Sequence, residues 1–144
     1  GKRLPWPQSQ RRLSILGLLG IAAITSSCDS NPFAQVPISG IVHYEDGSTI
    51  PATSMKLWFT SLAPAKDERT HPRPASAPVD IATGAIGQAT TYRYEDGVIQ
   101  GKHRVHLDLD PPNLVPRQFT SAATTTLEVD TSQLPWDIQI PKPR

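Results

Sequence analysis

The sequence predicts an all-β fold, and three observations support this fold class. Apolar and polar residues alternate with a period of two in several short runs, turn residues separate these runs at spacings of about ten residues, and 15 prolines occur among 144 residues. Such alternation is typical of strands with one buried face, and proline interrupts helices. We therefore expect about seven short strands in an immunoglobulin-like β-sandwich, preceded by a signal segment.

The first two expected strands lie on either side of an Asp-Gly turn. The run 36–44 alternates, with Val42 and Tyr44 on one face, and residues 45–48 (Glu-Asp-Gly-Ser) supply a turn. The run 54–60 alternates in the same way. Its apolar face consists of Met55, Leu57 and Phe59, with Lys56 and Trp58 on the opposite face. We expect these two runs to pair as antiparallel neighbours.

A loop and two shorter strands follow. Residues 61–76 contain three prolines and charges of both signs without periodicity, so we expect a mobile surface loop. The runs 77–81 and 86–92 flank the turn sequence Ala-Thr-Gly-Ala at 82–85, and we expect both runs to be strands.

Three further strands complete the expected fold. In the run 103–109, apolar residues occupy every second position, and Leu107 at their centre is expected to be buried. The proline pair 111–112 ends this strand, because proline cannot donate a hydrogen bond to a ladder. The runs 124–130 and 136–140 alternate again.

The N-terminal segment has the features of an export signal. Residues 2–12 are basic and contain no acidic side chain, and residues 13–24 form an apolar run of about a dozen residues. A helix needs about 20 residues to span a membrane, so this run matches the apolar region of a signal peptide instead. We assign residues 1–27 to a signal peptide. Arg11-Arg12 also suggests a twin-arginine signal, but the residues that follow match that motif poorly.

Small residues precede the only cysteine of the chain. Residues 25–27 (Thr-Ser-Ser) stand directly before Cys28, which resembles the lipobox at which bacterial lipoproteins are cleaved and diacylated. The resemblance implies lipidation of Cys28, which makes the membrane a partner because two or three acyl chains anchor a protein stably. Residues 28–35 then form a tether and residues 36–144 the β-sandwich domain. The alternatives are an ordinary secretory signal or an uncleaved anchor, each with an incidental cysteine.

Several turn-and-strand motifs follow one another in a characteristic order. They are Ile38-Ser39-Gly40-Ile41-Val42 with Asp46-Gly47, then Ala77 to Gly84 with Asp80, then Thr91-Tyr92 with Glu95-Asp96-Gly97, Gly101 and Val105. In this order they resemble small bacterial lipoproteins with a carboxypeptidase regulatory-like or transthyretin-like β-sandwich. The resemblance covers most of residues 28–140 and implies an envelope-facing accessory or binding module. The chain departs from the family at Ile86-Gly87, where an aromatic residue is usual, and at His103, where tyrosine is usual.

The charge and the motifs of the sequence argue against several classes of function. Beyond residue 27 there are 10 basic and 13 acidic residues, a net charge of −3 without a basic stripe, so we expect no nucleic-acid partner. The sequence contains no Gly-x-Ser-x-Gly motif and no second cysteine. We therefore expect no catalytic residues and no cofactor.

Histidines and aspartates are the candidate metal ligands. A spacing of three on a strand points His103 and His106 to opposite faces, so the two imidazoles do not share one ion. Asp108 and Asp110 lie on one face and offer two oxygen ligands to Ca²⁺, which takes about 6 to 8. We interpret these two aspartates as solvated carboxylates at a strand end rather than as a metal site.

Two further features receive a structural interpretation. The tetrapeptide Tyr-Glu-Asp-Gly occurs at 44–47 and again at 94–97, and we interpret both copies as tight turns rather than as a duplicated binding loop. Trp58 and Trp136 are interpreted as core or strand-face residues rather than as a platform for sugars.

Together these observations predict a lipid-anchored, non-enzymatic envelope protein on the periplasmic face or the cell surface. Its β-sandwich is expected to bind an envelope protein or a glycan, or to support other components. The alternative is a small periplasmic enzyme or metal-binding protein that uses His43, His103, His106, Asp108 or Asp110.

Overall fold

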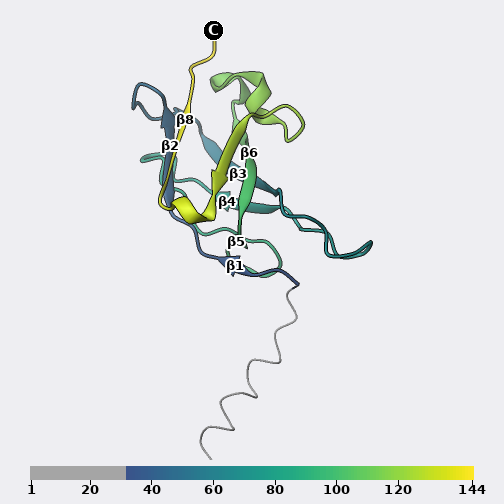
Figure 1. Cartoon of the computed structure of the whole chain (residues 1–144). Helices are drawn as coiled ribbons and strands as arrows, with labels where there is room; N and C mark the ends of the chain where they lie inside the picture. Colours follow the sequence, from purple (N-terminus) through teal and green to yellow (C-terminus); the bar gives the residue numbers. More distant parts are fainter. Residues whose placement is uncertain (1–31) are drawn as a thin grey trace, which may run out of the picture. The chain divides into compact units, whose positions relative to one another are not determined.

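Two long antiparallel strands, β3 (Ser54–Ser61) and β6 (Lys102–Asp110), form the centre of the fold (Figure 1). The structure is a computed structural model, and it describes residues 32–144. The expected signal peptide 1–27, Cys28 and the first part of the tether lie outside the described residues. The described residues are rich in strands, and their helices are short 3₁₀-helices, which confirms the β-rich fold class.

The two central strands belong to a four-stranded antiparallel sheet. β4 (Ala75–Pro78) pairs with β3, and β7 (Leu127–Asp130) pairs with β6, so the strand order is β4-β3-β6-β7. In the β3–β6 register, Leu57 lies opposite Leu107, and both side chains are buried. Alternate residues of these strands therefore form one apolar face that is removed from water, as the sequence predicts.

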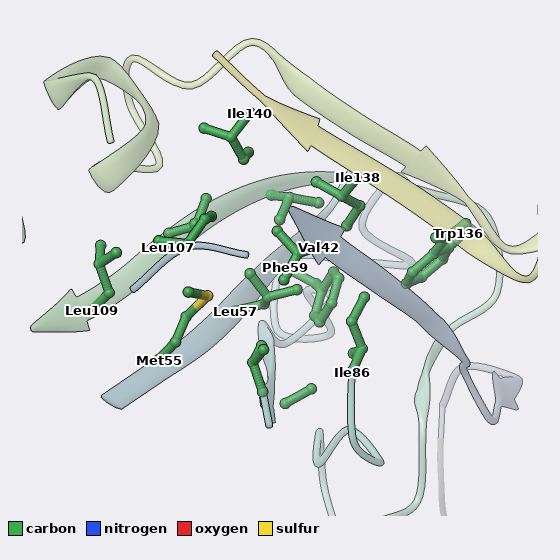
Figure 2. Packing of buried hydrophobic residues seen from close by; sticks show 14 of the residues in the cluster. Val42, Met55, Leu57, Phe59, Ile86, Leu107, Leu109, Trp136, Ile138 and Ile140 are labelled. Carbon is green, nitrogen blue, oxygen red and sulfur yellow. The ribbon is translucent and has the colours of Figure 1, made fainter. Parts of the chain in front are cut away.

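A parallel pair of strands covers the buried face of this sheet. β2 (Gly40–Tyr44) pairs with β8 (Trp136–Ile140), with Val42 opposite Ile138. Figure 2 shows side chains of this pair pointing toward those of β3 and β6, and together they form the main apolar cluster. The ring of Phe59 on β3 lies 5.5 Å from the ring of Trp136, measured between centroids.

The expected antiparallel pairing of the runs 36–44 and 54–60 is wrong. Both runs contain strands, but β2 and β3 belong to different sheets, and residues 45–53 connect the two sheets. Alternation specifies which side chains are buried but does not identify the neighbouring strand. The partner of β2 comes instead from β8, far along the chain.

A short pair of antiparallel strands includes residues near the start of the described chain. β1 (Gln35–Val36) pairs with β5 (Val98–Ile99), although the sequence predicts residue 35 as the end of a tether. The ammonium of Lys66 donates to the backbone carbonyl of Pro32 and lies 5.0 Å from the centroid of the Phe33 ring. Through these contacts residues 32–36 pack against the rest of the compact unit, which runs from Pro32 to Arg144.

Three 3₁₀-helices lie between β6 and β8. They are η2 (Pro112–Leu114), η3 (Arg117–Thr120) and η4 (Thr131–Gln133). Buried Val115 and Phe119 attach the first two helices to the core. In Figure 1 these two helices, in light green, lie at the same end of the fold as the C-terminal residues, in yellow.

Two of the predicted strands differ from those observed in the structure. The expected strand 77–81 is observed earlier, as β4, so the segment without strands between β3 and β4 spans residues 62–74. The expected strand 86–92 is absent, and three isolated bridges at residues 85–90 stand in its place. The carboxylate of Asp96 satisfies the backbone there by accepting hydrogen bonds, 2.8 to 3.1 Å long, from the N–H groups of Thr91, Tyr92 and Arg93.

Candidate functional site

The structure separates the histidines of β6 onto opposite faces, as predicted. His103 is buried, and its Nε2 donates a hydrogen bond to the backbone carbonyl of Ile99 at 2.6 Å. Burial lowers the pKa of His103, so the ring is neutral. His106 lies on the outer face beside Trp58, with ring centroids 6.4 Å apart and planes 11° apart. Trp136 is buried in the core, so of the two tryptophans within residues 32–144 only Trp58 lies on an outer sheet face.

Asp108 and Asp110 lie on the outer face of β6, and both side chains are exposed. Within residues 32–144 no three His, Cys, Asp or Glu side chains are grouped closely enough to hold a metal ion. The structure places the side chains named for the alternative enzyme or metal-binding hypothesis in three different locations. His103 is in the core, His106 and the two aspartates are on the outer face of the four-stranded sheet, and His43 is on the β2–β8 pair.

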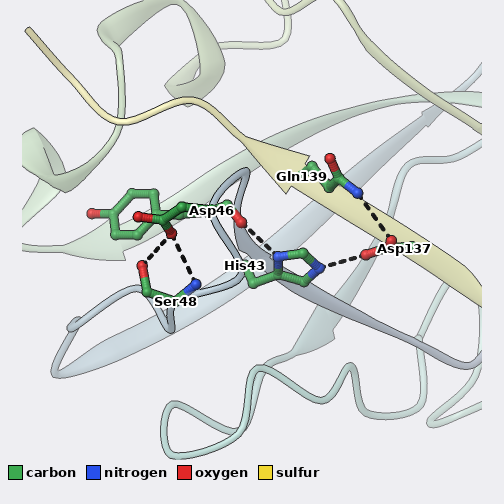
Figure 3. A network of polar contacts seen from close by, with 6 residues as sticks. His43, Asp46, Ser48, Asp137 and Gln139 are labelled. Carbon is green, nitrogen blue, oxygen red and sulfur yellow. Dashed lines mark hydrogen bonds and ion pairs between the residues drawn. The ribbon is translucent and has the colours of Figure 1, made fainter.

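His43 and Asp137 form a hydrogen-bonded pair on the outer face of the β2–β8 pair (Figure 3). His43 Nε2 lies 2.5 Å from Asp137 Oδ1, and His43 Nδ1 lies 2.6 Å from the backbone oxygen of Tyr44. Both partner oxygens are hydrogen-bond acceptors, so this arrangement favours the imidazole that carries a proton on each ring nitrogen. The hydrogen bond to Tyr44 raises the pKa of His43 most, burial opposes it, and Asp137 adds to the increase. Gln139 donates to the other oxygen of Asp137 at 3.1 Å.

The first Tyr-Glu-Asp-Gly turn holds the C-terminal residues. Asp46 Oδ2 lies 2.8 Å from the ammonium of Lys142, and Asp46 Oδ1 accepts hydrogen bonds from the backbone N–H and the hydroxyl of Ser48 (Figure 3). These partners, Lys142 first, hold the pKa of Asp46 far below its ordinary value. The carboxylate therefore stays charged and keeps the Lys142 side chain beside the turn.

The second copy of the tetrapeptide has a different role. Its Asp96 accepts hydrogen bonds from the preceding loop. Burial raises the pKa of this carboxyl, but the three backbone N–H donors outweigh burial, so the pKa lies below its usual value. Its Tyr94 is 84% exposed, whereas Tyr44 is 6% exposed. The two copies are therefore turns with different contacts.

A groove lies where two proline-rich segments meet. Seven residues of the segment 112–120, which includes η2 and η3, line one part of it, and residues 141–144 line the other. The volume of the groove is about 870 Å³, within the range of roughly 300 to 1,000 Å³ that is typical of small-molecule sites. We call this feature the terminal groove.

Tyr44 supports both parts of the terminal groove from the core side. Its hydroxyl donates a hydrogen bond to the backbone carbonyl of Leu114, in η2, at 2.6 Å. Its ring lies 5.3 Å from the ammonium of Lys142, measured from the centroid. One buried side chain at the end of β2 therefore contacts the two segments, and Asp46 fixes Lys142 from the other side.

The lining of the terminal groove is positively charged. It contains the cations Arg117, Lys142 and Arg144, and none of the described residues that line it is acidic. Asn113, Gln118 and Thr120 add amide and hydroxyl groups. Within the described residues, the lining side chains thus supply positive charge and hydrogen-bonding groups.

No motif in the sequence identifies these groove residues. The available signal is the alternation of proline with basic residues, at Pro116-Arg117 and at 141–144. Such short segments resemble ordinary loops until the fold brings them together.

Comparisons of the chain with protein-family models, with curated proteins and with solved structures gave no match. Within residues 32–144, no helix has the length and apolar content required to cross a membrane.

Proposed function

We propose that the described residues form an immunoglobulin-like β-sandwich of the transthyretin or carboxypeptidase regulatory-like kind, a class of modules that bind or support other molecules. The packing of the β2–β8 pair against the four-stranded sheet supports this class, because side chains from both layers form one apolar cluster. We further infer that the whole chain is a non-enzymatic envelope lipoprotein, which is anchored to a membrane by acyl chains on Cys28.

The observation that carries this proposal is the start of the compact unit at Pro32, shortly after Cys28. A lipid on the cysteine would hold such a module close to a membrane surface through only a few residues. The terminal groove supports a binding role, since its lining offers positive charge and hydrogen-bonding groups.

Metabolic labelling tests the lipid on Cys28. Cells expressing the full chain are fed an alkyne-bearing fatty acid, and the protein is followed by label and by membrane fractionation. We expect the wild type to be labelled and membrane-bound and Cys28→Ala to lose the label and to leave the mature membrane pool. Ser26→Ala is the matched control, because it changes a small residue nearby and retains the thiol. An unlabelled wild type, or a Cys28→Ala variant that keeps the label, contradicts the proposal.

A further inference from the structure

We propose that the terminal groove binds an anionic saccharide, meaning a small sugar that carries a carboxylate or a phosphate. The inference deepens the proposed function by naming the ligand class, and it depends on that function only for the biological setting. The binding site itself is assigned from the charge, the size and the support of the groove.

The positive charge of the groove lining favours an anionic ligand. Lys142 is paired with Asp46 at 2.8 Å, whereas neither Arg117 nor Arg144 takes part in an ion pair within residues 32–144. Two guanidinium groups therefore line the groove without a carboxylate partner there. Guanidinium matches carboxylate and phosphate oxygens in a planar, bidentate arrangement, so these arginines suit one anionic group on a ligand.

The rest of the lining suits a sugar ring. Proline side chains at 112, 116, 141 and 143 supply aliphatic surface against which the C–H faces of a sugar can pack. Asn113 and Gln118 each supply a donor and an acceptor for sugar hydroxyls. A groove of about 870 Å³ accommodates a small molecule of one or a few rings, whereas an extended peptide requires a longer surface.

The position of the groove favours a ligand from solution over a lipid headgroup. In Figure 1 the strands β1 and β5, next to the start of the described chain, lie at one end of the fold, and the light green helices and the C-terminal residues lie at the opposite end. Tyr44 contacts both parts of the groove through Leu114 and Lys142, so the site is formed before a ligand arrives. A preformed site loses less entropy on binding.

Calorimetric titration of the full chain in detergent at low salt tests the proposal. The probes are glucuronic acid, glucose 6-phosphate, glucose, inorganic phosphate and a tetra-aspartate peptide. We expect saturable binding of at least one of the two acidic sugars, weaker binding of inorganic phosphate, and no binding of glucose. Added salt should weaken the binding, because it screens the arginines.

Single substitutions locate the site. Arg117→Gln and Arg144→Gln should each weaken acidic-sugar binding by about tenfold or more, since each removes charge-assisted hydrogen bonds. Arg69→Gln is the matched control, because it removes the same charge from the exposed β3–β4 loop and should leave the affinity unchanged. Circular dichroism should show that all three variants fold.

Four results would overturn the inference. They are no binding of either acidic sugar, equal affinity for inorganic phosphate and the sugars, tighter binding of the acidic peptide, or equal effects of Arg69→Gln and Arg117→Gln. The Cys28→Ala chain should bind the sugars as the wild type does. Loss of lipid labelling and loss of sugar binding are therefore separate outcomes, which distinguishes failure of this inference from failure of the proposed function.

Discussion

His43 and Asp137 lie on the paired strands β2 and β8, and the hydrogen bond of 2.5 Å between their side chains connects residues 94 positions apart. The imidazole also donates to the backbone of its own strand at Tyr44. This pair therefore adds a charge-assisted contact to a parallel ladder at a solvent-facing position.

The first prediction concerns the pKa of His43. Because the folded state raises this pKa above 6.5, the stabilisation from His43 is complete below pH 6.5 and is lost as pH rises through the folded pKa. An NMR titration should place the pKa of His43 above 6.5, and Asp137→Asn should lower it. Glu128→Gln, an exposed change on β7, is the control. A His43 pKa unaffected by Asp137→Asn would refute the assigned contact.

His103 should have the opposite pH dependence. Burial lowers its pKa below 6.5, so the unfolded chain takes up a proton that the folded chain excludes, and the stability contribution of the neutral ring falls as pH drops below 6.5. Urea unfolding at pH 7.5 and at pH 5 measures this effect. We expect a smaller pH-dependent loss of stability in His103→Leu than in the wild type. Equal losses in the two proteins would mean that His103 is not the group responsible.

Leu107 tests the packing between the layers. It is 1% exposed and lies opposite Leu57, so Leu107→Ala should reduce the free energy of unfolding by about 2 to 5 kcal/mol. The neighbouring Asp108 is exposed on the other face, and Asp108→Ala should change stability by less than about 0.5 kcal/mol. Denaturant titration compares the two variants, and comparable losses would show that the faces of β6 are assigned incorrectly.

The two Tyr-Glu-Asp-Gly turns provide a matched pair of glycines. Gly47 and Gly97 have φ angles of 89° and 96°, so alanine strains the backbone at both positions, by about 1 to 2 kcal/mol. A Cβ at Gly97 would also lie 2.2 Å from the backbone oxygen of Val36, whereas a Cβ at Gly47 has no neighbour within 4 Å. Gly97→Ala should therefore lower the melting temperature much more than Gly47→Ala. Equal decreases would show that the close approach to β1 is absent.

Limited proteolysis tests the segment between β3 and β4. Most of residues 62–74 are exposed, and they contain neither strand nor helix. Trypsin should cut first after Lys66 or Arg69, while the bond after Arg73 should resist because Pro74 follows. Mass spectrometry of the first fragments identifies the site, and initial cleavage inside β6 would contradict the fold.

The sequence predicts the strands that have enough residues to show a period. Alternation identifies β2, β3, β6 and β8 together with their buried faces, because a period of two directly reports which side of a strand faces the core. It misses β1 and β5, since two-residue strands have no measurable period. It also misplaces the segment 86–92, where buried residues belong to a loop whose backbone hydrogen bonds are satisfied by Asp96.

The candidate site is harder to predict than the strands, because it depends on which strands pair rather than on a local pattern. The opposite placement of His103 and His106 follows from local geometry, and the structure bears it out. The terminal groove requires that residues near 115 and residues beyond 140 meet, which depends on the parallel pairing of β2 with β8. No local pattern specifies that pairing, so Arg117 and Arg144 stand out only after the strands are placed.

The β2–β8 ladder also determines when the chain can finish folding. Residues 40–44 cannot pair with β8 before residues 136–140 have been synthesised, so β2 stays without its ladder partner while the intervening segment is made. Contacts between residues so far apart in sequence form slowly, because closing a long loop precedes any gain from packing. The described part of the chain therefore acquires its native packing only after residue 140 has been made, and until then the apolar face of β2 is available for other contacts.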